Sequence, residues 1–408
     1  MFSSIARLRS GKIQRILLLL LVLVLVAGCA GAPLRPWSGA AIADDLLVVG
    51  SLDGRVLVLK DVSTGSPSIL WSEVLETRRT GGSPFDCGAG ISVPMRIYAT
   101  PTIAEGRVYI GGYDGYIYSF DIATGSRREF GTGGNIVGGA AVTADAVFVG
   151  NSQGKLFAFD LLLNEKWQFQ TKDKIWSSPA AHDGVVYISS TDHRLYAVDA
   201  ASGKEIWNLT TGAGIVSTPV VHDGTVYVGS LDWDLYAVEI ATDAEKQAAA
   251  ERPAGTAAPS REPKWVFTEA EGWYWTEALV YDDRIWIGNL DGSLYVINPA
   301  DPSDYRAYGF DDGIRSQPVV IDGKVIVGTQ GGVLYAIDES DEVSRFWSIA
   351  RGPDEEATLL APLLADPAEG LVYIHAWYQD RDGNQYDKLY AISVETEDKV
   401  IDYTLSGT

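Results

Sequence analysis

The chain is built from short apolar runs separated by polar turns, and this pattern returns about every forty residues. One copy, VYISSTDHRLYAVDAASGKEIW, runs from Val186 to Trp207, and a related copy, VYVGSLDWDLYAVEIATD, begins at Val226. Self-similarity at a fixed period is the signature of a repeat architecture. The hydrophobic pattern therefore describes one unit that is used many times.

The small residue that ends each run similar to VYVG gives the register of the repeat. These register residues are Gly50, Gly111, Gly150, Ser189, Gly229, Gly288, Gly328 and, in the last copy, His375. They are 61, 39, 39, 40, 59, 40 and 47 residues apart. An aromatic or aliphatic residue lies two positions before each of them. The chain thus holds eight copies of the unit, with three insertions between them.

Each unit predicts four short antiparallel strands. In the copy quoted above, strands are expected over residues 177–182, 185–190, 194–199 and 205–210. The Asp-Gly pair at 183–184 suits a two-residue hairpin, which needs positive φ angles. Small residues and proline in the first strand, as in SSPA, suit an innermost edge strand. Eight such units predict an all-β fold, an eight-bladed β-propeller of four-stranded antiparallel blades.

The propeller is expected to be a single domain over residues 38–408, with insertions at 77–97 and 243–263. The first and last units each hold four strands, so ring closure need not exchange a strand, although residues 32–37 could add to the last blade. The first insertion and the loop at 377–386 are expected to decorate one quadrant of one face. The second insertion has no periodic apolar face and is expected to be a mobile loop on the opposite face.

The N-terminus carries a targeting pattern. Four basic residues precede an unbroken apolar run at 16–27, which leads into VAGC. The run is too short to span a membrane but suits a signal peptide. It resembles a bacterial lipobox, which implies a signal peptide at 1–28, a lipidated Cys29 and a tether at 29–37; the alternative is an uncleaved anchor. Both interpretations place the protein outside the cytoplasm on a bacterial membrane, and Ala30 favours the outer membrane where the cell has one.

The net charge limits the classes of binding partner, and the cysteine content limits the possible disulfide bonds. The formal net charge is −22, and loss of the basic leader would bring it to −26. Such a surface repels nucleic acid and anionic lipid. It is compatible with a well-solvated surface that binds no charged partner, or with a basic partner. With only two cysteines and one of them assigned to lipid, a disulfide framework is excluded. Cys87 is then a free thiol or pairs between molecules.

The unit LYAVDAASGKEIW is similar to the repeat of pyrroloquinoline quinone (PQQ) enzymes and their non-enzymatic relatives. The resemblance implies the propeller fold and no particular activity. In the dehydrogenases the quinone lies against two adjacent cysteines, with Ca²⁺ nearby, and this chain has no adjacent cysteines. The lipobox and the eight units also resemble the BamB family, lipoprotein subunits of the outer-membrane β-barrel assembly machinery. That resemblance implies a scaffold without a cofactor, monomeric within a larger complex.

Aromatic and basic residues recur thirteen positions before the register residues. They are Trp37, Tyr98, Trp176, Trp275 and Arg315. The innermost strand of each blade begins there, so these side chains are expected around one mouth of the central channel. Rigid aromatic side chains in such a place could bind a partner loop, a peptide or a glycan. The alternative is that they pack between blades.

The last unit contains DRDGNQYD, whose hard oxygen donors could hold Ca²⁺. These candidate ligands are Asp380, Asp382, Asn384 and Asp387. The full twelve-residue calcium-loop pattern is missing, so a polar hairpin loop is the alternative.

Taken together, these patterns predict a membrane-anchored extracytoplasmic propeller that acts as a scaffold for an envelope protein partner. A BamB-like role in outer-membrane protein assembly fits this prediction. The alternative is a sensory propeller that binds a glycan or a peptide. A PQQ-dependent dehydrogenase lacks its expected cofactor features, so no enzymatic activity is predicted.

Overall fold

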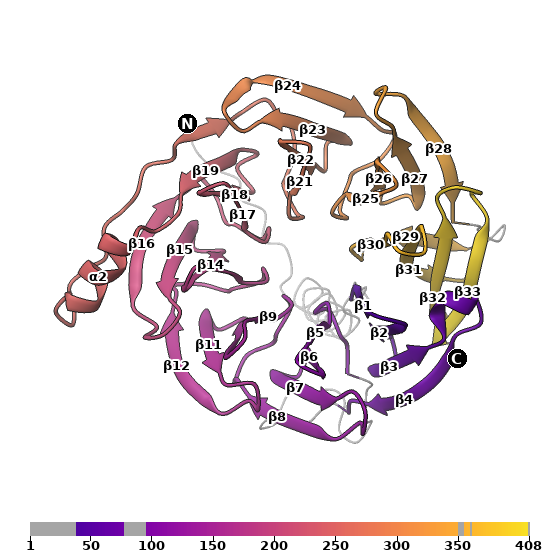
Figure 1. Cartoon of the computed structure of the whole chain (residues 1–408), viewed down its shortest axis with the longest axis horizontal. Coiled ribbons are helices and arrows are strands. Elements are labelled where there is room, and N and C mark those ends of the chain that lie inside the picture. The colour runs from indigo at the N-terminus through magenta and orange to yellow at the C-terminus, as the bar shows by residue number, and fades with distance from the viewer. Residues whose placement is uncertain (1–37, 77–94, 350–354, 360, 407–408) are drawn as a thin grey trace, which may run out of the picture. The chain divides into compact units, whose positions relative to one another are not determined.

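The computed structural model describes residues 38–76, 95–349, 355–359 and 361–406. In this part of the chain, eight antiparallel sheets are arranged in a ring, which confirms the predicted eight-bladed β-propeller (Figure 1). Cys29, Trp37, Cys87 and nearly all of the insertion at 77–97 lie outside the described residues. None of the described helices is long and apolar enough to cross a membrane.

The strands of each blade follow one another in chain order from the innermost to the outermost position. Blades one to four are β1–β4 (Ala40–Ala43, Leu46–Gly50, Arg55–Lys60, Ser68–Val74), β5–β8 (Thr102–Ala104, Arg107–Gly111, Tyr116–Asp121, Arg127–Gly131), β9–β12 (Ala141–Val142, Val147–Gly150, Lys155–Phe159, Glu165–Gln170) and β13–β16 (Ala180–His182, Val185–Ser190, Arg194–Asp199, Glu205–Thr210). A short 3₁₀ helix, Val62–Thr64, precedes β4.

The second half of the ring continues this order. Blades five to eight are β17–β20 (Val220–His222, Thr225–Gly229, Leu235–Glu239, Trp265–Phe267), β21–β24 (Leu279–Tyr281, Arg284–Gly288, Ser293–Asn298, Asp301–Gly309), β25–β28 (Val319–Ile321, Lys324–Gly328, Val333–Ile337, Val343–Ser348) and β29–β33 (Glu356–Leu359, Leu364–Asp366, Leu371–Gln379, Gln385–Ser393, Lys399–Ser406). In blade eight, β29 and β30 both pair with the long β31.

The fourth blade shows how the sequence pattern becomes a sheet. His182 of β13 pairs with Val185 of β14, so Asp183 and Gly184 alone form the turn between them. Their φ angles are 47° and 75°, as the predicted two-residue hairpin requires. All six residues of β14 are buried, because both faces of this strand are covered. The hydrophobic clusters accordingly join neighbouring blades, and blade packing stabilises the ring.

The packing of the blades explains why the register residues are small. In six blades, the glycine at the end of the second strand lies against a buried side chain from the segment that leads into the next blade. A Cβ added to Gly150 would lie 2.1 Å from Cγ2 of Ile175, and one added to Gly288 would lie 2.2 Å from Cγ2 of Ile314. The glycine at this position is therefore required by the close approach of the next blade.

We expect Gly150→Ala to lower the free energy of unfolding by about 1–3 kcal/mol, since the added methyl group overpacks the contact with Ile175. Chemical denaturation measures the change. Gly309→Ala is the matched control, because no atom lies within 4 Å of its added Cβ. In a double-mutant cycle, Gly150→Ala should cost less in an Ile175→Ala background. An equal cost in both backgrounds would contradict the assigned contact.

The ring closes without strand exchange among the described residues. Blade one is made only of strands from the beginning of the described chain and blade eight only of strands from its end. A shared hydrophobic cluster joins them, with Leu47 and Leu59 from blade one and Tyr373 and Leu389 from blade eight. Side-chain packing thus joins the two blades, and residues 32–37, which were considered for the last blade, lie outside the described part.

A buried polar cluster also ties the two blades together. His375 Nδ1 donates a hydrogen bond to the Ser38 carbonyl at 2.7 Å, and Nε2 lies 2.7 Å from Oδ2 of Asp387. The same Oδ2 accepts from the Leu52 N–H at 2.9 Å, and Oδ1 accepts from the Ser406 hydroxyl. Asp387 is only 1% exposed. His375 is the one large register residue. It makes a hydrogen bond to the first blade, whereas the register glycines of other blades make close apolar contacts with the next blade.

The surroundings of His375 favour its charged form. Burial opposes the charge, but the hydrogen bond and the negative charge of Asp387, helped by the Ser38 carbonyl, outweigh it and raise the pKa of His375. The imidazolium can then donate on both sides of the ring at once. The cluster is a charge-assisted link across the closure of the ring.

The insertion at 243–263 is not the predicted mobile loop. Its first half is the helix α2, Asp243–Glu251, which lies outside the ring beside β16 (Figure 1). Thr242 and Glu245 form a capping box at its N-terminus, which satisfies free N–H groups of the first turn. The sequence prediction was wrong because it required a periodic apolar face, whereas this helix docks through a single buried alanine, Ala249, together with hydrogen bonds from Lys204 and Lys246 to backbone carbonyls.

The second half of the insertion covers the outer edge of blade four. Arg252 donates to the carbonyls of Glu205 and Ile206 at 2.6 and 3.1 Å. The guanidinium of Arg261 lies 4.8 Å from the ring centroid of Trp207, which is only 1% exposed. The insertion thereby pairs with β16 and shields it from solvent.

The predicted long loop at 377–386 is mostly strand. β31 and β32 remain paired through Trp377↔Asp387 to Gln379↔Gln385, so only residues 380–384 form the turn. The prediction failed because polar residues in this stretch continue the alternation of a strand. The predicted decorated quadrant therefore has a shorter loop on its blade-eight side, and its other component lies outside the described residues.

Candidate functional site

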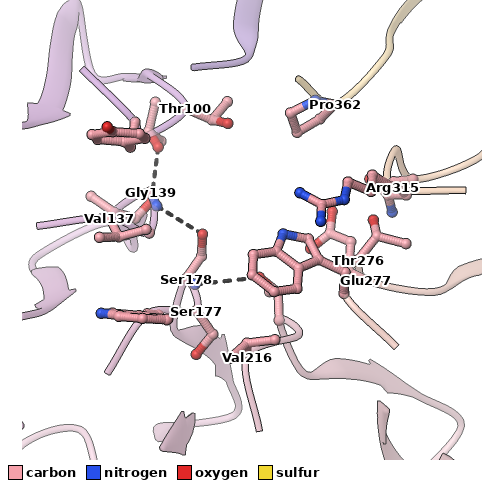
Figure 2. A pocket seen from close by; sticks show the side chains of 18 of the residues that line it. Thr100, Val137, Gly139, Ser177, Ser178, Val216, Thr276, Glu277, Arg315 and Pro362 are labelled. Carbon is pink, nitrogen blue, oxygen red and sulfur yellow. Dashed lines mark hydrogen bonds between the residues drawn. The ribbon is translucent and has the colours of Figure 1, made fainter. Parts of the chain in front are cut away.

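A cavity of about 340 Å³ lies where the innermost strands of the eight blades converge. Its wall contains residues from every blade, so it surrounds the axis of the ring. Figure 2 shows this wall, with Thr100, Gly139, Ser178, Glu277 and Arg315 around the opening. The volume is at the lower end of the range for small-molecule sites.

The structure brings together four of the residues that the repeat alignment singled out. Tyr98, Trp176, Trp275 and Arg315 all line the cavity. The fifth, Trp37, lies outside the described residues. The alignment found them because equivalent positions in a propeller are carried to the same height around the axis.

These four side chains differ in what they present to the cavity. Tyr98 is 3% exposed, and its ring lies 4.9 Å from that of Tyr113. Its role is therefore packing, which was the alternative to ligand binding. Trp176 is 36% exposed, and Lys174 lies over its ring at 5.5 Å. The Arg315 guanidinium lies 4.8 Å from the ring centroid of Trp275, which is a favourable cation–π geometry.

Arg315 carries an unsatisfied donor into the cavity wall. Its Nε is buried and makes no hydrogen bond within the described structure. Burial lowers the pKa of Arg315, and the negative charge of Asp312 opposes that shift. The stacked arginine is therefore held in place by Trp275, while part of its hydrogen-bonding capacity stays unused.

Glu277 is a cavity residue that the sequence analysis missed. It lies two residues after Trp275 and makes no hydrogen bond or ion pair with any described residue. Burial alone raises the pKa of its carboxyl group to about 7. A carboxyl group with so shifted a pKa in a cavity marks a candidate functional site.

The repeat itself contains the signal that reveals Glu277. Eleven positions before the register residues, the innermost strands carry a ring of mostly small or neutral side chains. This ring is Gly39, Thr100, Gly139, Ser178, Thr218, Glu277, Gln317 and Leu364. Only one of the eight is charged, so packing in this layer does not require a carboxylate.

Hydrogen bonds between neighbouring blades hold this layer of the wall. The Gly139 N–H donates to Oγ of Ser178 at 2.8 Å, and the Ser178 N–H donates to Oγ1 of Thr218 at 3.3 Å (Figure 2). On the other side, Nε2 of Gln317 donates to the Ala278 carbonyl at 3.1 Å. The strands beside Glu277 are therefore linked to one another without a hydrogen bond from its carboxyl group.

The four calcium candidates do not converge on one point. Oδ1 and Oδ2 of Asp380 accept from the backbone and side-chain amides of Asn384, which closes the hairpin turn. Both oxygens of Asp387 are engaged in the cluster at the ring closure, and Asp382 is exposed. Within the described ranges, no group of three or more acidic, histidine or cysteine side chains could hold a metal ion. Calcium binding at this loop gains no support from the geometry.

The cavity does not fit a pyrroloquinoline quinone. That cofactor is a planar tricarboxylate, whereas the wall offers one guanidinium that is already stacked on Trp275. The described residues also provide no acidic group of the kind that would hold its calcium ion. The donor set thus gives no support for quinone binding, and the predicted lack of a cofactor stays a prediction.

One face of the ring carries the exposed tryptophans. In blades two to seven, a backbone hydrogen bond joins the loop that enters the blade to the turn after its second strand, such as Thr191 N–H to the Lys174 carbonyl and Leu290 N–H to the Trp273 carbonyl. These loops and turns therefore share a face, as propeller geometry predicts. The three exposed tryptophans of the described residues are all on them, namely Trp176, Trp233 and Trp273. They come from the consecutive blades four, five and six.

Trp233 occupies a backbone position that five other blades give to glycine. Four residues after the register residue, the turn adopts a left-handed conformation. Glycines fill this position in five blades, as Gly54, Gly115, Gly154, Gly292 and Gly332, whereas blade four has His193 with φ 71° and blade five has Trp233 with φ 79°. A bulky residue at positive φ is strained and is a marker of functional sites. Trp233 is 49% exposed, so burial does not explain its presence.

Comparison with known proteins agrees with this architecture. A family model described as outer membrane protein assembly factor BamB matches residues 26–162 and 164–301. Among solved structures, BamB from Moraxella catarrhalis is 20% identical, with a TM-score of 0.60 over 86% of this chain and 95% of that chain. The computationally designed Ika8 protein is 13% identical, with a TM-score of 0.61 over the same shares. No curated protein matches the chain significantly. Because the family model covers more than half of the chain, the protein belongs to the family of outer membrane protein assembly factor BamB.

Proposed function

We propose that the protein is an extracytoplasmic scaffold that docks an envelope protein through the face that carries Trp176, Trp233 and Trp273. The observation that carries this proposal is the strained, half-exposed Trp233, where five other blades have glycine. Exposed aromatic side chains on rigid turns are typical anchors of protein interfaces. The family membership supports a role in outer-membrane protein assembly.

The partner is expected to present basic and apolar groups. The formal net charge of −22 favours association with a basic surface and opposes binding to nucleic acid. The tryptophans supply the apolar anchors within this acidic surface. The scaffold would act as a monomer within the larger assembly and would need no catalytic activity. Alcohol oxidation by the purified protein with added PQQ and calcium would contradict that last point.

Anchoring to the membrane is a separate part of the proposal. Cys29 follows an apolar run and small residues in the order of a lipobox. We propose that it carries lipid and holds the propeller at the outer membrane. Labelling cells with radioactive palmitate tests this, and label retained by Cys29→Ala would argue against the anchor.

The docking face is tested by affinity purification of tagged protein from native membranes. We expect Trp233→Gly to lose the envelope partner, while its free energy of unfolding stays the same or rises by up to about 1 kcal/mol as backbone strain is relieved. Loss of binding without loss of stability separates an interface role from a structural one.

The matched control for this experiment is Leu162→Ala. Leu162 is 43% exposed and lies in the turn between β11 and β12, on the opposite face. This variant should retain the partner. Equal partner recovery with Trp233→Gly and wild-type protein would overturn the proposed docking face.

A further inference from the structure

The central cavity contains two ionisable side chains of opposite sign that the scaffold does not use. Glu277 of blade six and Arg315 of blade seven both line it. Neither forms an ion pair with the other or with any other described residue, and Nε of Arg315 has no hydrogen-bond partner. Unpaired charges in a partly dehydrated wall destabilise the empty protein unless a ligand satisfies them.

The other blades show that the ring does not require these charges. At the position of Glu277 they have glycine, threonine, serine, glutamine or leucine, and at the position of Arg315 all seven have tyrosine, valine, tryptophan or proline. The two charged exceptions are in adjacent blades and open into the same cavity. Such placement points to a ligand that carries one positive and one negative group.

We propose that the cavity binds a short zwitterionic peptide, with its free amino group on Glu277 and its free carboxylate on Arg315. A guanidinium is well suited to a carboxylate, and a carboxylate accepts charge-assisted hydrogen bonds from an ammonium group. Trp275 holds the arginine from one side, which limits the entropy lost when the ligand binds.

The other properties of the cavity select this ligand class. The net charge of −22 disfavours an anionic ligand, and Arg315 disfavours a purely cationic one. A volume of about 340 Å³ accommodates a peptide of a few small residues. The hydroxyl oxygens of Ser178 and Thr218 already accept hydrogen bonds from backbone N–H groups, which leaves Glu277 and Arg315 as the distinguishing recognition elements.

The experiment is a calorimetric titration of the full-length protein with L-alanyl-L-alanine. Binding is expected for the free dipeptide. Acetylation of its amino end or amidation of its carboxyl end should each weaken binding on the order of tenfold or more, since each removes one charge-assisted contact. This comparison needs no variant of the protein, so it tests the proposal even if a substitution impairs folding.

Variants then assign each end of the peptide. Glu277→Gln should lower the affinity for free dialanine to that of the acetylated peptide, and it should leave the affinity for the acetylated peptide unchanged. Arg315→Gln should lower the affinity for free dialanine to that of the amidated peptide, and it should leave the affinity for the amidated peptide unchanged. Thr218→Ser is the control, because it keeps the hydroxyl group that accepts from Ser178, and it should bind as wild type.

Several outcomes would overturn the proposal. These are no heat of binding with dialanine at millimolar concentration, equal affinity for the free and blocked peptides, or binding of the neutral disaccharide maltose in preference to dialanine. The docking face is tested separately through Trp233, so loss of partner capture in Trp233→Gly with unchanged dialanine binding would leave both conclusions intact.

Discussion

Asp387→Ala is expected to lower the free energy of unfolding by about 3–5 kcal/mol, because it removes one member of a buried pair at the ring closure. Without this carboxylate, the Leu52 N–H, the Ser406 hydroxyl and Nε2 of His375 lose their acceptor. Each of these donors is then left without a partner in a place that water reaches poorly.

Chemical denaturation measures the loss, and hydrogen exchange locates it. Exchange should increase first in β2 and β31, on the two sides of the closure. Asp382→Ala is the matched control: it is an exposed carboxylate of the same hairpin, and its effect should stay within about 0.5 kcal/mol. Similar effects of the two substitutions would show that the cluster does not hold the ring closed.

The same cluster makes the free energy of unfolding depend on pH. The folded state raises the pKa of His375, so the stability from its protonation is complete below the ordinary histidine pKa. It declines as the pH rises through the higher folded value. Asp387→Asn keeps the shape of the side chain and should remove most of this slope.

Glu277→Gln is expected to stabilise the protein at pH 8 by up to about 3 kcal/mol, and to have little effect near pH 4. The folded state raises the pKa of Glu277 from 4.5 to about 7, so the protonated acid is favoured by folding. The associated stability is complete below pH 4.5 and is lost as the pH rises toward 7. The neutral amide avoids this loss.

Denaturation of both proteins across this pH range measures the difference. The exposed Glu269→Gln serves as control and should show a flat difference. A Glu277→Gln curve parallel to that of the wild type would contradict the burial of an unpaired carboxyl group. Stabilisation by removal of a charge would agree with a residue that serves binding at a cost in stability.

Much of the fold was predictable because the repeat imposes the same packing problem eight times. Gly150 and its equivalents are small since the next blade approaches closely, and a requirement repeated at a fixed period is visible in one sequence. The same reasoning placed Trp176, Trp275 and Arg315 at one cavity. Comparison of equivalent turns would also have found Trp233, and comparison of innermost strands would have found Glu277.

Other features could not be predicted because their partners are distant in sequence or chemically unexpected. The capping box of Thr242 and Glu245 was readable, but the docking of Arg252 on strand carbonyls depends on the exposed edge of β16. Asp387 looked like a calcium ligand, and its contact with Leu52 spans 335 residues. No local pattern distinguishes a carboxylate that binds metal from one that accepts buried hydrogen bonds.

The sequence by itself determined the eight blades, the alternation of buried and exposed positions, and the residue types around the channel mouth. These follow from local geometry, which acts over a few residues and is repeated. Only the tertiary structure decided that Asp387 closes the ring, that Tyr98 is buried, and that Glu277 and Arg315 stay unpaired in one cavity. Whether a charge is satisfied depends on side chains brought together from distant blades, and those distances are set by the closed ring.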